Sequence, residues 1–433
     1  MWSENAVAPA RHRIFVGDNL AWLRDDVMRP LHEAVQVIYI DPPYNTKTEK
    51  SYRDRFHSGA WLAGISERIA AAHPFLKQSG VLFISIDDNE YAALKIACDG
   101  IFGAANFIGT FITRQAQRSN SRLINTTHEY ILAYARDKNA VRPFSISRMD
   151  IPEEREMILT LSDAIQRELY AHGREAATKK LAQEIRRICA EMNITWLKNY
   201  NCIDEAGHIF FGKDLSTPAA PREVHIPEIG LHLQPLATRG WSSDEKFIAL
   251  HRAGRLVYKG TRPYEIHYLH ESKDSAPSVL NFYSRQGSKD LNELGLRGLF
   301  DTPKPVALIK FLIRLAAQPG DVVMDFYAGS GTTAQAVYEI NQEDKKNLSY
   351  VLIQREEAVS QKSKSYEICR RLGMRPLVSE IMLHRINTWL KKNGRRPDHE
   401  VFQHTNQGKC IPRCSISAPS VVSRHIRSAI ETL

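Results

Sequence analysis

The sequence lacks the features of membrane and secreted proteins. No apolar run approaches the roughly 20 residues that a membrane helix needs. Positions 1–10 contain no basic start followed by an apolar core, as a secretory signal would. The six cysteines are scattered along 433 residues, which excludes a disulfide framework, and no second pair follows Cys410 and Cys414 at metal-ligand spacing. We therefore expect no membrane contact, free thiols, no metal and a cytoplasmic protein.

Acidic residues are scarce at the carboxyl end of the chain. Positions 359–433 contain 14 Lys and Arg against five Asp and Glu, so this stretch alone accounts for the formal net charge of +9. Such a stretch suits a polyanionic partner such as DNA, and plain solvation explains it equally well. Beyond about position 393, scattered proline, serine and basic residues predict a poorly ordered tail.

The remaining chain reads as an α/β protein that is interrupted by an insert. In 11–136, buried strands at 35–40, 81–86 and about 130–134 alternate with helices at 61–77 and 90–101, which predicts parallel βαβ units. Residues 137–296 break this rhythm with a charged helical pair near 158–190, then short mixed strands. The α/β pattern returns in 297–390, and 391–433 form the basic tail.

A glycine-containing loop at 325–333 joins a predicted strand to a predicted helix. Its glycines let the backbone approach a ligand, and the helix start offers unpaired N–H groups to an anion. A nucleotide P-loop would need Lys where Thr332 stands, and a dinucleotide fingerprint would have Ala334 in its last glycine position. A ligand-free turn explains the glycines as well.

The tetrapeptide Asp41-Pro42-Pro43-Tyr44 directly follows a buried strand. Two prolines stiffen the backbone and remove two N–H donors, so Asp41 and the Pro42 carbonyl are free to accept hydrogen bonds in a cleft. Two such acceptors would localise the lone pair of an exocyclic amine such as adenine N6 as it attacks a methyl group. The Tyr44 ring can stack on a base that has left the duplex. A proline-rich turn without function is the weaker explanation.

In this order, the two motifs resemble those of β-class DNA adenine-N6 methyltransferases, and in particular the modification (Mod) subunits of type III restriction-modification systems. Further stretches that are similar to these subunits lie at 17–19, 83–90, 127–134, 203–209 and 302–305, and the resemblance covers roughly residues 14–387. It implies a Rossmann-like, circularly permuted methyltransferase sheet in which the insert is the target-recognition domain. It also implies S-adenosylmethionine (AdoMet) as cofactor, DNA as partner and a prokaryotic, nucleoid-associated protein.

The resemblance assigns roles to individual residues. The catalytic set is Asp41, Pro42, Pro43 and Tyr44. Asp18 would bind the cofactor adenine, and Lys304 with Pro305 would close over the cofactor. Gln354 stands where the family usually has an acidic residue for the ribose, with Glu356 just beyond. The implied cofactor-binding residues are Asp18, Asn19, Lys304, Pro305, Asp325, Phe326, Ala328, Gly329, Ser330, Gly331, Thr332, Thr333, Gln354 and Glu356.

The sequence also suggests residues that contact DNA and subunits that bind this chain. Arg114, Arg118 and Arg122 form a basic stretch that suits phosphates or simple solvation, and Arg239 and Trp241 in the insert are candidates for contacts near bases. The resemblance implies a restriction (Res) subunit as partner and a homodimer, for which the helical pair is a candidate. A solitary or type II adenine enzyme is an alternative.

Two chemical alternatives concern the reaction itself. Cytosine-N4 enzymes share the architecture but usually have Ser in place of Asp41, and RNA or protein-glutamine methyltransferases usually have Asn there. A DNA-binding subunit without activity is the alternative of another class. Intact Asp41, Tyr44, Gly329 and Gly331 argue against it.

Overall fold

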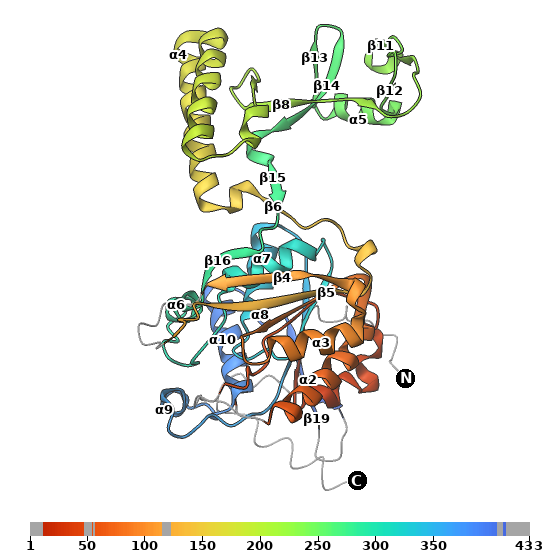
Figure 1. Ribbon diagram of the computed structural model, residues 1–433. Coiled ribbons are helices and arrows are strands. Elements are labelled where there is room, and N and C mark those ends of the chain that lie inside the picture. The colour runs from red at the N-terminus through yellow and green to blue at the C-terminus, as the bar shows by residue number, and fades with distance from the viewer. Residues whose placement is uncertain (1–11, 47–53, 55–56, 115–122, 405–409, 413–433) are drawn as a thin grey trace. The chain divides into compact units, whose positions relative to one another are not determined.

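The computed structural model describes residues 12–46, 54, 57–114, 123–404 and 410–412, which belong to two compact units (Figure 1). Unit 1 combines the chain up to Phe144 with the chain from Pro277 onward, and unit 2 is Ser145–Ala276. The insert is thus narrower than the predicted 137–296. Strand β16 (Val279–Tyr283) belongs to unit 1 because it pairs with β4 (Phe107–Arg114), and helix α6 (Arg285–Glu293) follows it there.

Unit 1 is built on a ten-stranded sheet in the order β16-β4-β5-β3-β2-β17-β18-β1-β19-β20. The prediction of parallel strands is correct for most neighbours. It is wrong for β5, which runs antiparallel to both β3 and β4, since a direct return from β4 needs no crossover helix. The remaining strands are β1 (His12–Val16), β2 (Val35–Ile40), β3 (Leu76–Ile86), β5 (His128–Ala135), β17 (Val322–Asp325), β18 (Ser349–Gln354), β19 (His399–His404) and β20 (Cys410–Pro412).

Helices cover both faces of this sheet, which explains why all six residues of β2 are buried. One core joins strand residues such as Ile38 and Ile84 to Trp22, Ile69 and Leu94 on three helices. The helices of unit 1 besides α6 are α1 (Asn19–Leu23), α2 (Ser58–Ala72), α3 (Tyr91–Phe102), α7 (Val306–Ala316), α8 (Thr332–Glu343), α9 (Lys364–Arg371) and α10 (Val378–Lys392).

Two predicted boundaries in unit 1 are wrong. The helix predicted for 61–77 ends at Ala72, because a 3₁₀ turn that contains Pro74 follows and Leu76 already pairs with Val35. The predicted tail also contains regular structure: β19 pairs in parallel with β1 and so extends the sheet. No helix in the described part of the chain is long and apolar enough to cross a membrane.

The order of the strands places distant parts of the sequence side by side. Strand β2 precedes unit 2 in the chain and β17 follows it, yet the two are parallel neighbours. Their carboxyl ends therefore meet at one edge of the sheet, which we call the catalytic edge. The carboxyl ends of β4 and β16 and the amino end of β5 lie at the same edge.

Unit 2 contains the predicted helical pair. The pair forms α4 (Pro152–Glu191), in which Gly173 has φ +83° and separates two helices that pack on each other through Ile158, Ile165 and Leu181. A four-stranded sheet, three two-stranded sheets and α5 (Asp244–Arg252) complete the unit. Its strands are β6 (Ser145–Ser147), β7 (Cys202–Ile203), β8 (Ile209–Asp214), β9 (Ser216–Thr217), β10 (Val224–Ile226), β11 (Leu231–Leu233), β12 (Gly240–Trp241), β13 (Leu256–Lys259), β14 (Arg262–Tyr268) and β15 (Lys273–Ser275).

Candidate active site

A cavity of about 830 Å³ at the catalytic edge contains both sequence motifs. Asp41, Pro42, Pro43 and Tyr44 enter it from the end of β2, and the loop after β17 enters from the neighbouring strand. Its volume lies within the roughly 300–1,000 Å³ that is typical of small-molecule sites. We call this cavity the cleft.

Lys304, which follows unit 2 in the chain, contacts the catalytic motif, which precedes unit 2. Its Nζ lies 3.3 Å from Asp41 Oδ1, donates to Glu129 Oε2 and to the Tyr44 hydroxyl, and sits 4.9 Å from the centre of the Tyr44 ring. The Tyr44 hydroxyl donates to Glu129 Oε2 at 3.2 Å. The indole N–H of Trp61 donates to the Pro43 carbonyl at 2.7 Å and fixes the turn after β2. A largely buried cation, whose side chain is 13% exposed, is thus shared by two carboxylates.

Burial and neighbouring charges shift the pKa values of Asp41 and Lys304 in opposite directions. Burial raises the pKa of Asp41, and the neighbouring Glu129 adds to this, while the Lys304 ammonium opposes both. Burial alone would lower the pKa of Lys304, but the two carboxylates outweigh it and raise the pKa. Lys304 therefore remains charged, and its ammonium limits the rise in the pKa of Asp41 that burial causes.

The glycine loop is organised by Asp325 and Gln354. Asp325 accepts hydrogen bonds from the Tyr327 backbone N–H at 3.0 Å and from the Thr333 hydroxyl at 2.6 Å, and burial raises its pKa to about 7. The Gln354 side-chain oxygen accepts from the Gly329 N–H at 2.7 Å. Gly331 has φ +81°, and a Cβ there would lie 3.0 Å from Met382, so glycine is required at the start of α8.

A fully buried arginine on α10 holds the same loop from the protein interior. Arg385 donates to the hydroxyls of Ser330 at 2.8 Å and Thr332 at 2.7 Å, and to the side-chain oxygen of Gln335 at 2.9 Å. Burial lowers the pKa of this guanidinium to about 10. Its positive charge lies beneath the loop and beside the amino end of α8.

The structure brings many of the predicted cofactor-binding residues together. Lys304, Asp325, Ala328, Gly329, Ser330, Thr332, Thr333 and Gln354 line the cleft. Asp18, Asn19, Pro305, Phe326, Gly331 and Glu356 do not line it.

Most of the residues outside the cleft have structural contacts. Asp18 caps α1 and pairs with Arg68 at 3.1 Å, and Asn19 donates to the Phe326 carbonyl at 2.8 Å. Glu356 pairs with Arg375, whereas its neighbour Glu357 lines the cleft. Lys304 is placed with the catalytic motif rather than over the glycine loop.

The predicted DNA-contact residues have different surroundings. Arg114 is exposed at the end of β4, and Arg118 and Arg122 lie outside the described residues. Arg239 is exposed in unit 2. The prediction for Trp241 needs correction: the side chain is only 5% exposed, packs in an apolar core and donates its N–H to the Gln234 carbonyl. Trp241 thus belongs to the core of unit 2 and, unlike the similarly buried Tyr44, does not line the cleft.

Three functional residues were missed from the sequence. Glu129 lies in the 127–134 stretch, whose resemblance to Mod subunits was the available signal. Arg385 is one basic residue among many in the carboxyl-terminal part, and Trp61 is an apolar residue of an amphipathic helix. Nothing in the local sequence of Arg385 or Trp61 indicates that these two residues contact the motifs.

The fold and the cleft together define a Rossmann-like methyltransferase domain. A family model described as DNA methylase, for N6 and N4 enzymes, matches residues 35–365, and the chain belongs to this family.

Several curated relatives are restriction-modification proteins. The chain is 28% identical to the Mod subunit of the type III enzyme EcoP15I of Escherichia coli, over 82% of the chain and 60% of that protein. It is also 28% identical to the StyLTI Mod subunit of Salmonella typhimurium, over 91% of the chain and 60% of that protein. Identity to the type II methyltransferase M.KpnI of Klebsiella pneumoniae is 26%, over 86% of each protein. The chain thus spans about 60% of the length of these two Mod subunits.

Proposed function

We propose that this chain transfers the methyl group of AdoMet to N6 of an adenine in DNA. The observation that carries the proposal is the shared cleft, which is lined by Asp41, Pro42 and Tyr44 together with the glycine loop. One cavity thereby contains acceptors for an amine, an aromatic ring for a base and a loop for a cofactor. DNA as substrate is supported by membership of the DNA methylase family.

The glycine loop has the chemistry that AdoMet requires. Backbone N–H groups at the start of α8 and the buried guanidinium of Arg385 favour the cofactor carboxylate. Glu357 and Gln354 line the cleft where hydroxyl groups of a ribose would need acceptors. When bound, AdoMet supplies an electrophilic methyl group.

The residues after β2 act on the amine. In its ionised form Asp41 accepts one N–H of the adenine amine, and the Pro42 carbonyl accepts the other, which localises the nitrogen lone pair. As the nitrogen gains positive charge, the Asp41 carboxylate stabilises it and takes up the proton that leaves. Tyr44, tethered to Glu129 and Lys304, places its ring against the base.

Transfer of labelled methyl groups tests the reaction directly. The purified chain is incubated with tritiated AdoMet and DNA of mixed sequence, and the DNA is then digested to nucleosides. Label in N6-methyladenine is the expected result. Label in N4-methylcytosine, or no transfer, would overturn the proposal.

Substitution of Asp41 tests its role within that reaction. Asp41→Ala should lower transfer by about 100-fold or more, because general acid–base groups contribute about 10² to 10⁴. AdoMet binding, measured by calorimetry, should remain close to that of the wild type. Asp137→Ala is the matched control, because Asp137 follows β5 at the opposite edge of the sheet. Undiminished turnover in Asp41→Ala would refute the role.

We also propose that the chain is the modification subunit of a type III system and forms a homodimer. Similarity to two type III Mod subunits supports the first part. A solitary enzyme is the second candidate, because M.KpnI matches the chain over 86% of both lengths. Purification from the native host distinguishes them: a Mod subunit should be accompanied by a nuclease subunit that mass spectrometry identifies, and light scattering gives the number of copies.

A further inference from the structure

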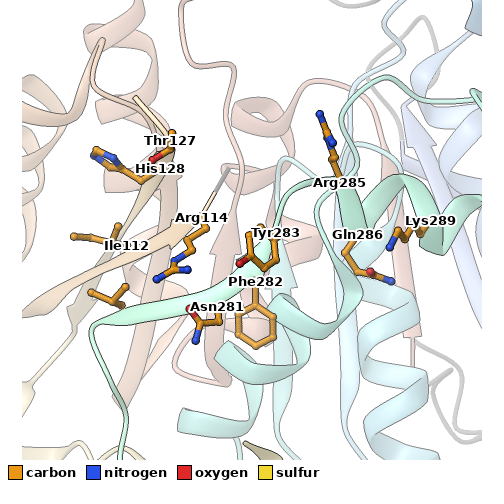
Figure 2. Close-up of a pocket in the computed structure, with 11 residues that line it drawn as sticks. Ile112, Arg114, Thr127, His128, Asn281, Phe282, Tyr283, Arg285, Gln286 and Lys289 are labelled. Carbon is orange, nitrogen blue, oxygen red and sulfur yellow. The ribbon is translucent and has the colours of Figure 1, made fainter. Parts of the chain in front are cut away.

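A second cavity, of about 1,020 Å³, lies in unit 1 between strands β4 and β16 and helix α6 (Figure 2). We call it the groove. In Figure 2, Arg114 of β4 lies beside Tyr283 of β16, and Arg285, Gln286 and Lys289 continue along α6. Because the carboxyl ends of β4 and β16 belong to the catalytic edge, the groove opens at the same edge as the cleft.

The groove is lined by cations that the described structure leaves unpaired. Arg114, Arg285 and Lys289 are exposed, and no hydrogen bond or ion pair joins their side chains to another described residue. Elsewhere in unit 1 the exposed Arg24 is paired with the carboxylate of Glu67. Three unpaired cations along one groove favour a ligand with several negative charges.

The groove also presents an aromatic side chain. Strand β16 alternates, so that Leu280 is buried while Val279, Asn281 and Tyr283 are exposed. The Tyr283 side chain is 50% exposed beside Arg114. An open aromatic ring next to cations is the combination that binds single nucleic acid strands, in which phosphates meet the charges and a base stacks on the ring.

The groove and the cleft share a lining residue, and α6 packs on a segment that lines the cleft. Arg285 lines both cavities. A Cβ on Gly287 would lie 1.9 Å from the Pro303 carbonyl, so α6 packs directly on the segment that carries Lys304. Asp290 on the same helix accepts from the Val306 N–H at 2.8 Å. A strand bound along α6 would therefore lead to the catalytic motif.

We propose that the groove binds the DNA strand next to the methylated base, with phosphates on Arg114, Arg285 and Lys289 and a flanking base on Tyr283. This inference rests on the proposed function, because it takes the target base to occupy the cleft. Arg285 lines both cavities, and the row of cations along the groove gives a strand that leaves the cleft a path. The contacts are with phosphate and with a ring face, so they position the strand without reading its sequence.

The test measures DNA affinity as a function of salt. In Arg114→Ala/Lys289→Ala, two phosphate contacts are lost, so the slope of log K against log salt should become shallower by about 1.4 to 1.8, at about 0.7 to 0.9 per phosphate. Tyr283→Ala should weaken DNA binding by roughly fivefold or more and leave that slope unchanged, because stacking contributes about 1–3 kcal/mol per base. AdoMet affinity should be unchanged in both variants.

Lys138→Ala/Arg142→Ala is the matched control, because it removes two exposed cations beyond β5, at the opposite edge of the sheet. Affinities and slopes of the groove variants equal to those of this control would overturn the proposal. Failure of the proposed function looks different: the wild type would transfer no methyl group, while the groove variants would still lose DNA affinity.

Discussion

Lys304 Nζ lies 3.3 Å from Asp41 Oδ1, although Asp41 precedes unit 2 in the chain and Lys304 follows it. The ion pair thus joins the two parts of unit 1 that the insert separates, as the pairing of β2 with β17 does. It sets the charge of the group that acts on the amine, because burial raises the pKa of Asp41 and Lys304 opposes that rise. Folding of the two parts of unit 1 into one sheet is thus coupled to the pKa of the Asp41 carboxyl group.

Lys304→Met should move the acidic limb of the pH–rate profile to higher pH. Without the ammonium, burial and Glu129 raise the pKa of Asp41 further, so ionised Asp41 appears only at higher pH. A neighbouring cation lowers a carboxyl pKa by about 1–3 units, and the limb should shift by about that amount. Single-turnover methyl transfer measured as a function of pH gives the shift.

Lys310→Met is the control for that experiment. Lys310 lies on α7 and pairs with Glu339 and Glu343, away from the cleft. An acidic limb that stays in place in Lys304→Met would show that Lys304 does not govern the charge of Asp41. A selective loss of AdoMet affinity would instead restore the role over the cofactor that the sequence predicts.

The raised pKa of Asp325 predicts how stability depends on pH. Its pKa is about 7 in the folded protein against a usual value of 3.8, so between these values the folded state binds the proton and the unfolded state has lost it. Stability from this group therefore falls as pH rises from about 4 to 7 and then levels off. Asp325→Asn removes the dependence, and its stability relative to wild type should rise by up to about 4 kcal/mol over that range.

Urea unfolding of both proteins without AdoMet at several pH values gives this difference. The comparison cancels the other carboxyl groups, since they are common to both proteins. If the difference in unfolding free energy between the two proteins does not change with pH, Asp325 is not protonated in the folded protein. The loss of one hydrogen-bond acceptor in Asn changes the stability by an amount that does not depend on pH, so it leaves the slope unaffected.

The sequence was sufficient for the parts that depend on local patterns. Strand β2 has the predicted bounds, and the catalytic tetrapeptide and the glycine loop share a cavity as their motifs imply. Periodicity could not give the direction of β5, because a strand has the same alternation in either direction. Likewise, β19 lies in a stretch whose composition predicts disorder, and only its pairing with β1 orders it.

Side-chain networks were predicted least well, because they join residues far apart in the chain. Arg385 and Ser330 lie on different elements, and neither has a local signal for the contact. Trp241 shows the opposite error: an aromatic residue beside Arg and Gly suggested an exposed site, whereas packing against Phe247 buries it.

Gly287→Ala should be destabilising, because its Cβ would lie 1.9 Å from the Pro303 carbonyl. Overpacking of this kind costs about 1–3 kcal/mol, and the segment that carries Lys304 must shift to relieve it. A lower Tm and a lower rate of methyl transfer are expected together. Gly100→Ala is the matched control: its Cβ meets nothing within 4 Å on α3, so it should keep the activity and raise stability by about 0.4–1 kcal/mol. Equal Tm values for the two variants would contradict the close packing of α6.

Arg385 should act as a positioning residue for the cofactor. Arg385→Met removes the donors to Ser330, Thr332 and Gln335 and the buried positive charge beneath the loop. Hydrogen bonds to charged groups contribute about 1.5–3 kcal/mol, so AdoMet affinity should fall by about tenfold or more while DNA affinity stays the same. Calorimetric titration with AdoMet and anisotropy with DNA measure the two separately.

Two further variants show whether charge or geometry is responsible for the effect of Arg385. Arg385→Lys keeps the charge but loses the planar fork, so it restores AdoMet affinity only if attraction to the cofactor carboxylate dominates. Thr332→Val keeps the charge and the side-chain shape but removes one acceptor, so it weakens binding only if the geometry of the loop dominates. Unchanged AdoMet affinity in a folded Arg385→Met protein would contradict both explanations, and the buried guanidinium would then serve stability alone.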